Sequence, residues 1–402
     1  MGHKSVFIVY DVAVRDFAEK YAEKSYGNRV VGELALVCDE PHKTLSTIEH
    51  ICRAMLQVSV NRSDILLSIG GGVCSDICGL AANLYKRGMR LEFVPTTLLS
   101  MADAAHGGKN GVNLDGIKNA IGSFKLPDKV HFQFETLETL PKREIFSGCT
   151  EIIKTFLLFD KKRYFEAIEL MKELNYKLSE TEEFTPSKSS INTLETERFT
   201  PNKNSINILK IGQFSSSQNT DNKPEIKPFG PNPHNKEQIK QTKNSDTEFE
   251  ISSHNKDKET LEIIKEMGRL AKVAAKYKMK IVRKDPMDKG LRHLLNYGHT
   301  FGHAIEWKQS REKETQLYSH GEAVAIGIIQ AQTISETNGW SEKGLADKLK
   351  ADFQKAGLPT ELPYNEDELT EAIKNDKKAE GGKVDFVFIE KIGKARRKKI
   401  EL

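Results

Sequence analysis

Short apolar runs alternate with helix-like patterns over the first third of the chain. Runs rich in β-branched and aromatic residues predict strands at residues 6–10, 34–37, 65–69 and 91–94. Between them, residues 15–25 and 44–59 follow the pattern of amphipathic helices. Strands and helices that alternate at this spacing predict a parallel sheet covered by helices. We therefore expect an α/β domain over residues 1–134.

The rest of the chain is predicted to be mostly helical. Leu, Ile and Ala recur at spacings of three and four over residues 141–174 and again over residues 259–375. One further apolar run, residues 384–389, predicts a strand that is followed by a glycine turn. We expect a second, mostly α-helical domain that comprises residues 135–174 and 258–402.

Residues 175–257 interrupt this second domain with a different composition. The segment is rich in Asn, Ser, Thr, Lys and Glu and contains no Ala, Val, Met, Cys or Trp. Such a chain buries too little apolar surface to offset its loss of conformational entropy on folding. Residues 180–192 recur in similar form at 195–207, but two copies are too few for a solenoid. We predict a disordered, low-complexity insertion in a surface loop, with partner docking on its repeated Phe-Thr-Pro as the alternative.

The charge pattern argues against a nucleic-acid-binding protein. The 402 residues include 61 Lys and Arg against 57 Asp and Glu, so the net charge is +4, and the two signs are interleaved. One basic cluster, residues 394–399, is interpreted as a solvated C-terminal tail. The five cysteines form no Cys-x-x-Cys pair, and no apolar run reaches the ~20 residues of a membrane span. We expect a cytoplasmic protein with free thiols and neither a nucleic-acid nor a membrane partner.

A glycine-rich turn follows the third predicted strand. Gly70, Gly71 and Gly72 join residues 65–69 to a helix that is predicted to begin near Ser75. Glycines let the backbone approach a ligand closely, and a helix N-terminus offers free N–H groups to a phosphate. The spacing differs from Gly-x-Gly-x-x-Gly, so the common dinucleotide fingerprint is absent. A phosphate cradle and a tight turn without a ligand explain these glycines equally well.

The next segments supply hydroxyl, amide and cationic groups. The fourth predicted strand ends at Thr96 and Thr97. The following glycine-containing segments, which we predict to be loops, carry two lysines and two asparagines, namely Lys109, Asn110, Lys118 and Asn119. Such groups suit a bound phosphate or carboxylate, and solvated loop charges are the alternative.

A run of polar residues at helical spacing follows in the second domain. If residues 292–306 form one helix, Arg292, Asn296, His299 and His303 lie within a roughly 60° arc at ~100° per residue. Glycines at 298 and 302 each cost about 1 kcal/mol inside a helix. We therefore expect another part of the protein to approach this helix closely.

One carboxylate and two imidazoles in this region suit a catalytic Zn²⁺ site. Glu151 and Lys154 share a helical face at a spacing of three, and His320 precedes an apolar helix. A catalytic zinc keeps three protein ligands and leaves positions open for substrate oxygens. The spacing suggests Glu151, His299 and either His303 or His320 as ligands. Ordinary structural histidines are the alternative.

Short blocks spread over nearly the whole chain, apart from the insertion, resemble the 3-dehydroquinate synthase family of the sugar phosphate cyclases. They are residues 70–76, 87–88, 94–99, 107–109, 118–119, 139–144, 290–292, 296–306 and 320–327, together with Asp103, Glu151 and Lys154. The resemblance implies an NAD-binding domain over residues 1–134, a helical metal and substrate domain, and a homodimer.

The resemblance also implies an activity. Members of this family are lyases of the shikimate pathway to aromatic amino acids, and they convert 3-deoxy-arabino-heptulosonate 7-phosphate to 3-dehydroquinate and phosphate. NAD⁺ takes a hydride from a substrate carbinol and returns it after phosphate has left, and an intramolecular aldol reaction closes the ring. The implied cofactors are NAD and Zn²⁺ or Co²⁺, and the implied substrate is a small sugar phosphate.

Residue by residue, the resemblance assigns the metal ligands to Glu151, His299 and His320. The residues that would surround the substrate phosphate are Lys109, Asn119, Lys154, His303 and Lys377. Those that would hold the carboxylate and hydroxyl end of the substrate are Lys278, Arg292 and Asn296. Arg87 would reach the site of the neighbouring subunit. For NAD it implies Gly71, Gly72, Val73, Asp76, Thr96, Thr97, Asp103, Lys109 and Lys118, with Glu40 and Lys43 near the adenosine.

The chain departs from the family pattern at four positions. Ala13, Ser75, His106 and Asn110 stand where Asn, Gly, an apolar residue and Thr are usual. Other sugar phosphate cyclases and metal-dependent polyol dehydrogenases are the alternative functions. The carboxylate-binding residues Lys278, Arg292 and Asn296 argue against other cyclases, whose substrates carry no carboxylate. The phosphate-binding residues Lys109, Asn119 and Lys154 argue against a polyol dehydrogenase.

Overall fold

A five-stranded parallel sheet forms the first part of the protein, with strand order β2-β1-β3-β4-β7. Its strands are β1 Val6–Asp11, β2 Val30–Leu36, β3 Ile65–Gly70, β4 Arg90–Pro95 and β7 Lys129–Val130. The computed structural model describes residues 4–183, 256–311, 317–365, 368–369, 373 and 383–401. The four predicted strands are confirmed. β7 was not predicted, because a strand of two residues is too short to show a recognisable pattern.

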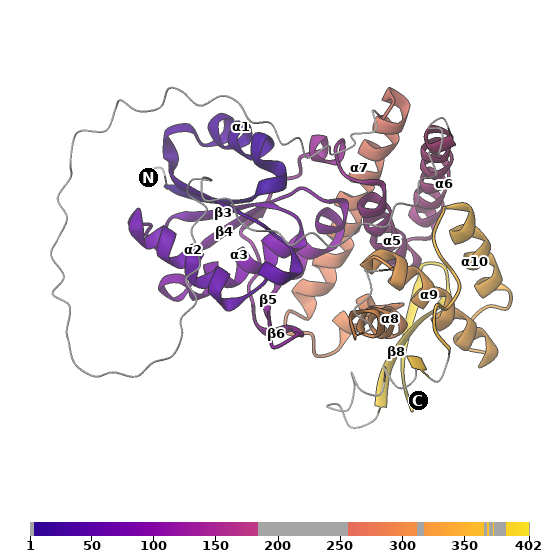
Figure 1. Ribbon diagram of the computed structural model, residues 1–402. Coiled ribbons are helices and arrows are strands. Elements are labelled where there is room, and N and C mark those ends of the chain that lie inside the picture. The colour runs from indigo at the N-terminus through magenta and orange to yellow at the C-terminus, as the bar shows by residue number, and fades with distance from the viewer. Residues whose placement is uncertain are drawn as a thin grey trace, which may run out of the picture. The chain divides into compact units, whose positions relative to one another are not determined.

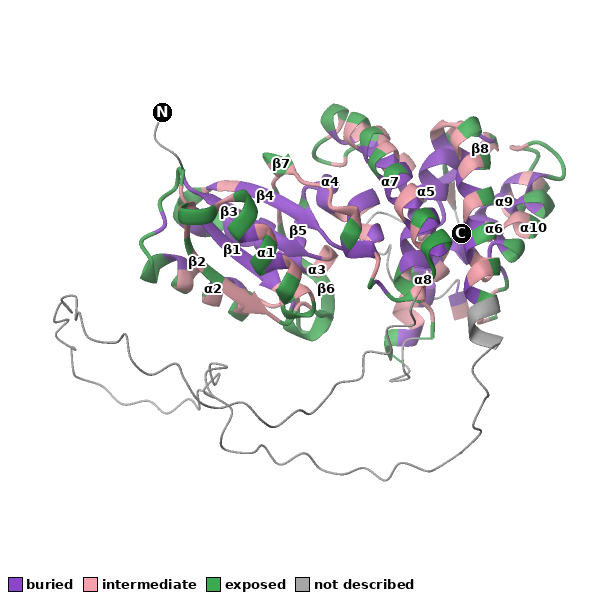
Figure 2. Cartoon of the chain, turned by 90° about the horizontal axis from the view of Figure 1, so that it is seen from above, coloured by how far each residue is buried: buried purple, intermediate pink, exposed green. Residues whose placement is uncertain are grey.

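Helices cover both faces of this sheet (Figure 1). α1 Arg15–Ser25 packs on one face through Ala18 and Ala22. α2 Leu45–Gln57 and α3 Gly72–Leu84 pack on the other face. Successive side chains of a strand point to opposite faces of the sheet. Because both faces are covered, nearly all residues of β1, β3 and β4 are buried (Figure 2). This explains why apolar residues follow one another along these strands and do not alternate with polar ones. Both predicted helices and the α/β fold class are confirmed.

A β-hairpin replaces the predicted loops around residues 109–119. β5 Lys109–Leu114 pairs antiparallel with β6 Ile117–Phe124. Asp115 and Gly116 turn the chain with φ values of +50° and +79°. Asp-Gly between two strands is a strong hairpin signal, so the sequence carried the information that the loop prediction overlooked.

The second part is mostly helical. Its long helices are α5 Lys142–Phe159, α6 Lys161–Glu183, α7 Lys258–Lys284, α8 His299–Arg311, α9 His320–Thr337 and α10 Leu345–Lys355. Short helical turns complete the described chain at η1 Val12–Val14, η2 Gly27–Arg29, η3 Glu40–His42, η4 Tyr85–Arg87, η5 Ser100–Ala104, α4 Ala105–Gly107, η6 Phe134–Leu137 and η7 Leu291–Asn296. A large apolar cluster joins α5, α6, α7, α9 and α10. The described residues of both parts belong to one contact unit.

The predicted insertion begins too early in the sequence. α6 continues to Glu183 because Leu174 and Leu178 are both buried at helical spacing. Asn175 Nδ2 also donates a hydrogen bond to the Lys355 carbonyl at 3.4 Å. Residues 184–255, which include both Phe-Thr-Pro copies, lie outside the described residues, so the prediction of disorder stays a prediction.

Residues 292–306 do not form the single helix that the spacing suggested. η7 ends at Asn296, and Tyr297 and Gly298 separate it from α8. Gly298 has a φ of +79°, a left-handed conformation that favours glycine. The expected close approach is present, because a Cβ at Gly298 would lie 2.7 Å from Ile328 Cγ1 and one at Gly302 would lie 3.3 Å from Val324 Cα.

The basic C-terminal cluster is a strand and not a tail. β8 Lys383–Lys391 and β9 Lys394–Glu401 form an antiparallel hairpin that turns at Gly393, where φ is +86°. Ala395 and Ile400 pack against apolar clusters, which fixes β9 although most of its cations are exposed. Among the described residues, no helix is long and apolar enough to cross a membrane, and all five cysteines are free.

Candidate active site

Two charged side chains, those of Glu151 and Lys154, lie within the buried and mostly apolar part of α5. Glu151 is 1% exposed and Lys154 is 2% exposed, and Lys154 Nζ lies 2.6 Å from Glu151 Oε2. Ile152 and Ile153 between them are fully buried. Neither Glu151 oxygen has a hydrogen bond of acceptable geometry among the described residues. Because an unsatisfied buried charge is costly, this carboxylate is poised for a further cation.

Two imidazoles complete a possible metal site at Glu151. His299 Nε2 lies 3.9 Å and His320 Nε2 lies 3.6 Å from Glu151 Oε1. One ligand atom from each of the three residues lies within 4.8 Å of the other two. His303 is exposed, and although its ring centroid is 5.2 Å from that of His299, it is not part of this set. The geometry therefore favours His320 over His303 as the third ligand.

The second nitrogens of both rings are oriented by the protein. His299 Nδ1 lies 3.2 Å from the Tyr297 carbonyl, which can only accept a hydrogen bond, so Nε2 keeps its lone pair. His320 Nδ1 lies 3.5 Å from Glu306 Oε2. A carboxylate or carbonyl behind the ligating imidazole is the usual support of a metal-binding histidine. The prediction did not name Glu306, although its spacing of three from His303 on α8 was a usable signal.

Glycines bring the three helices of the site together. Both histidines are the first residues of their helices, α8 and α9. A Cβ at Gly321 would collide with the Ser147 backbone of α5, and the Gly321 N–H donates to Ser147 Oγ at 3.0 Å. Ser319 and Glu322 form a capping box that fixes the start of α9. The start of α9 thus lies directly against α5, one helical turn from Glu151.

Charge and burial shift the pKa values of all three possible ligands. Burial opposes ionisation of Glu151, but Lys154 and His320 outweigh it and lower the pKa to about 2. Burial lowers the pKa of His320, but Glu151 and Glu306 raise it to about 10. Burial, Lys154 and the neighbouring histidines hold the pKa of His299 well below its usual range. Without a metal, one imidazole is therefore neutral and the other is protonated.

Two buried cations lie against Gly107. Arg292 Nη2 donates to the Gly107 carbonyl at 2.7 Å, and Lys278 on α7 forms an ion pair with Asp103. A Cβ at Gly107 would lie 3.4 Å from Arg292 Nη2 and 3.5 Å from Lys278 Nζ. Burial lowers the pKa of Lys278. Asn296 is exposed at the end of η7. These two cations could hold an acidic group of a ligand.

A second polar cluster joins three residues predicted to serve NAD, Glu40, Lys43 and Asp76, with Asn119, which was predicted to bind the substrate phosphate. Lys43, which is 4% exposed, donates to Asp76 Oδ2 and to Asn119 Oδ1, each at 2.7 Å. Asn113 links Asn119 to Glu40, because its Oδ1 accepts from Asn119 N and its Nδ2 donates to Glu40 Oε2 at 2.8 Å. The structure thus brings four of the predicted residues together, and Asn113 is a member that the sequence analysis missed.

The glycine turn connects β3 to α3 as predicted, and α3 begins at Gly72. Gly71 is its N-cap and packs against Thr97, where a Cβ would lie 3.2 Å from Thr97 Cγ2. The Thr96 N–H donates to the Gly70 carbonyl at 3.0 Å. Val73 follows in the first turn of α3. The turn is thus tight for packing reasons as well, so the two interpretations of the glycines are compatible.

The residues predicted to bind phosphate have separate partners. Lys109 forms an ion pair with Asp288, Asn119 contacts Lys43, and Lys154 contacts Glu151. Lys118 and Arg87 are exposed, the latter with a φ of +64°. Lys377 lies outside the described residues.

Three of the four departures from the family pattern are buried. Ser75 Oγ donates to the Gly71 carbonyl at 3.1 Å. Asn110 Nδ2 donates to the carbonyls of Gly108 and Lys125 at 3.1 and 2.9 Å, and its side chain fills the space beside Gly79. His106 stacks on Phe132 with ring centroids 5.5 Å apart. Ala13 is exposed in η1. The three buried departures thus have local hydrogen-bond or packing partners.

Two family models match this chain, and relatives match most of its length. Residues 33–147 match the family described as 3-dehydroquinate synthase N-terminal, and residues 236–379 match 3-dehydroquinate synthase C-terminal. The 3-dehydroquinate synthase of Campylobacter concisus is 31% identical over 89% of this chain and 76% of that protein. That of Streptococcus mutans is 30% identical over 95% of this chain and 84% of that protein.

Solved structures show the same fold. A 2-epi-5-epi-valiolone synthase from Streptomyces hygroscopicus, solved with NAD⁺ and Zn²⁺ bound, aligns with a TM-score of 0.67 and 20% identity over 99% of this chain and 88% of that chain. A 2-deoxy-scyllo-inosose synthase, complexed with carbaglucose-6-phosphate, NAD⁺ and Co²⁺, aligns with a TM-score of 0.66, also at 20% identity over 99% and 88% of the two chains.

Proposed function

This chain belongs to the 3-dehydroquinate synthase family, and from that premise we propose that it converts 3-deoxy-arabino-heptulosonate 7-phosphate to 3-dehydroquinate and phosphate. The observation that carries the proposal is the set of Glu151, His299 and His320, in which the carboxylate is buried and both of its oxygens lack a hydrogen bond among the described residues. This set lies beside Lys154, and Lys278 lies close enough to Glu151 for the two charges to interact.

The residues present fit a divalent metal. Glu151 is ionised, and the Nε2 lone pair of His299 is available. His320 would lose its proton to hold the cation, and Glu306 would support its ring. When bound, Zn²⁺ or Co²⁺ would acidify a substrate hydroxyl, and NAD⁺ would accept and return a hydride. Three protein ligands leave room for substrate oxygens.

The surrounding cations suit the charges of the substrate. Lys278 and Arg292 would hold the carboxylate, with Asn296 beside them at the end of η7. Lys154 and His303 would face the phosphate together with Lys109, Asn119 and Lys377. Burial lowers the pKa of Lys278, and the same poorly solvated surroundings strengthen the attraction between its protonated form and a carboxylate. A buried pair of cations disfavours cyclases whose substrates carry no carboxylate.

The dinucleotide would occupy the first part of the protein. Its phosphates would meet Gly71, Gly72 and Val73 at the N-terminus of α3, where backbone N–H groups are available. Glu40, Lys43, Asp76, Asp103 and Lys118 would bind its polar groups, with Thr96 and Thr97. This assignment makes residues 1–134 the NAD-binding domain, and residues 135–183 and 258–402 the metal and substrate domain, because α6 continues to Glu183.

We further propose a cytoplasmic homodimer in which the exposed Arg87 reaches the partner's site. Light scattering coupled to size-exclusion chromatography measures the mass in solution. A monomer would remove this role of Arg87. The five free thiols suit a reducing compartment.

The activity is tested by incubating the metal-loaded protein with NAD⁺ and the heptulosonate phosphate. Phosphate release and absorbance of NADH are followed together. Phosphate release without net NADH supports the cyclase. Net NADH without phosphate release would indicate a polyol dehydrogenase. Turnover only of sugar phosphates that lack a carboxylate would indicate another cyclase.

A further inference from the structure

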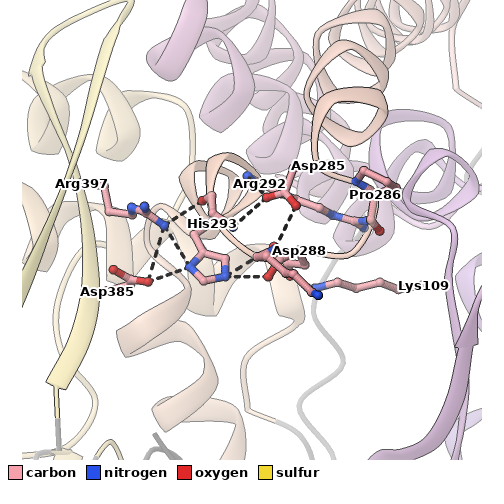
Figure 3. A network of polar contacts seen from close by, with 10 residues as sticks. Lys109, Asp285, Pro286, Asp288, Arg292, His293, Asp385 and Arg397 are labelled. Atoms are coloured by element: carbon pink, nitrogen blue, oxygen red, sulfur yellow. Dashed lines mark hydrogen bonds and ion pairs between the residues drawn. The ribbon is translucent and has the colours of Figure 1, made fainter. Parts of the chain in front are cut away.

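His293 on η7 lies between two hydrogen-bond acceptors (Figure 3). Its Nδ1 is 2.7 Å from Asp385 Oδ2 on β8, and its Nε2 is 2.9 Å from the Asp288 carbonyl. A carboxylate and a carbonyl can only accept hydrogen bonds, so both contacts are satisfied only when both ring nitrogens carry a proton. The form of His293 that fits this site is therefore the imidazolium.

Three carboxylates around the ring favour the same form. The Arg397 guanidinium opposes it, because Nη1 lies 3.2 Å from Nδ1 and can only donate a hydrogen bond. Asp288 and Asp285 face His293 from the loop before η7, Asp385 faces it from β8, and Arg397 faces it from β9. Arg397 Nη1 donates to the Gly290 carbonyl at 2.7 Å and lies 3.6 Å from Asp385 Oδ2. Burial lowers the pKa of His293, but hydrogen bonds and charge from Asp385 and Asp288 together raise it by more. The pKa of His293 is therefore above its ordinary value. The Oδ1 atoms of Asp288 and Asp385 are buried and have no hydrogen bond to any described residue, so they gain from a nearby cation.

The loop held by His293 touches two predicted substrate-binding cations. Asp285 closes the loop, because Oδ2 accepts from the N–H groups of Gly290 and Arg292 at 2.8 and 3.0 Å. Asp288 has a φ of +55° and forms an ion pair with Lys109 on β5. A non-glycine residue keeps such a conformation only when its surroundings fix it. Arg292 at the end of the loop bonds to Gly107.

We propose that His293 is a positioning residue that, as the imidazolium, fastens the 285–290 loop to the β8–β9 hairpin and so sets the positions of Arg292 and Lys109 for substrate binding. The inference rests on the proposed function, in which these cations meet the carboxylate and phosphate of the substrate. Loss of the proton breaks one of the two contacts of the ring. The loop then loosens, and binding of the substrate through its carboxylate and phosphate weakens while the metal set is unchanged.

The kinetic test uses His293→Gln, with His131→Gln as the matched control. His131 also lies 2.7 Å from a carboxylate, that of Glu92, but its contact is in the first sheet. KM and kcat for the heptulosonate phosphate are measured from pH 6 to 9. His293→Gln should raise KM about tenfold, as expected when a hydrogen bond to a charged group is lost, with kcat within about twofold. Wild-type KM should rise towards high pH, and this rise should be absent in His293→Gln. The control should follow wild type.

A second arm does not depend on turnover. Hydrogen exchange of the amides in residues 285–292 is measured without substrate and expressed relative to intrinsic exchange at each pH. Exchange should be faster in His293→Gln than in wild type, and it should increase in wild type as pH rises. His293→Lys, which keeps a charge, should restore slow exchange at high pH. If wild type protein exchanges these amides equally at pH 6 and 9, the inference is overturned, even if His293→Gln fails to fold.

The two arms separate the failures. Absence of any turnover in wild type would contradict the proposed function, while hydrogen exchange would still decide the role of His293. An unchanged KM and pH profile in an active His293→Gln protein would overturn the positioning role. Equal losses in kcat and KM that accompany a lower melting temperature would also overturn it, because they would indicate a purely structural residue.

Discussion

Lys154 Nζ lies 2.6 Å from Glu151 Oε2, one turn away on α5, and both side chains are almost fully buried. This pair places the acidic ligand and a cation of the proposed site on one rigid helix. The lysine keeps Glu151 ionised, since it helps to lower the carboxyl pKa to about 2 despite burial. The other carboxylate oxygen faces His299 and His320.

The metal assignment predicts the behaviour of Glu151→Gln. The change keeps the shape of the side chain but removes the negative charge, so turnover should fall at least about 100-fold. Zinc should raise the melting temperature of metal-stripped wild type and leave that of the variant unchanged. Glu144→Gln, at an exposed position in the first turn of α5, is the control. Wild-type activity in Glu151→Gln would refute the ligand assignment.

The polar cluster around Lys43 predicts its role in NAD binding. Lys43→Met leaves Asp76 without its cation, and burial already raises the pKa of that carboxyl. Asn119 loses the same contact. We expect roughly tenfold weaker NAD⁺ binding by calorimetry. Lys24→Met, on the exposed side of α1, should bind as wild type does. Equal affinities in the two variants would remove this cluster from the NAD site.

Two glycines of one motif should differ in their response to alanine. In Gly298→Ala the new Cβ would lie 2.7 Å from Ile328 Cγ1, and the backbone has a φ of +79°, which alanine adopts unfavourably. This substitution should lower the free energy of unfolding by about 3 kcal/mol. Gly302→Ala meets a contact of 3.3 Å within a regular helix, where alanine is favoured, and should change it by less than about 1 kcal/mol. Urea unfolding measures both. Similar losses would contradict this account.

The low pKa of the buried His106 predicts that the folded protein loses stability in acid. Burial first, and then Lys278, lower its pKa to about 4 from an ordinary value of 6.5. The unfolded chain binds a proton near pH 6.5 and the folded protein only near 4, so lowering the pH across this window favours unfolding. The loss is at most about 3 kcal/mol.

His106→Leu should remove that dependence. The variant places an apolar side chain beside Phe132. Its free energy of unfolding should fall less between pH 7 and 4.5 than that of wild type, as measured by urea titrations at each pH. His50→Gln on α2 is the control and should keep the wild-type slope. Parallel curves for all three proteins would show that His106 titrates normally.

The sequence predicted the elements whose signals are local. Apolar runs located β1, β3 and β4, helical spacing gave α1 and α2, and the glycine turn between β3 and α3 was expected. Glu151 and the three histidines were also recognisable, because residue types that bind metals are few and their spacing is informative. The missed hairpin of β5 and β6 was a local signal as well, in Asp115 and Gly116.

By itself, then, the sequence determined the family, the fold class and the candidate chemistry. Spacing left His303 and His320 open as partners of Glu151, and the family resemblance implied His320. Only the tertiary structure showed where the chain breaks before His299 and that the basic C-terminal residues form β9. It alone brought His293 to Asp385, which is 92 positions further along the chain. The physical reason is that strands, turns and helices follow from neighbouring residues, whereas a site depends on contacts between distant segments that only the packed core places.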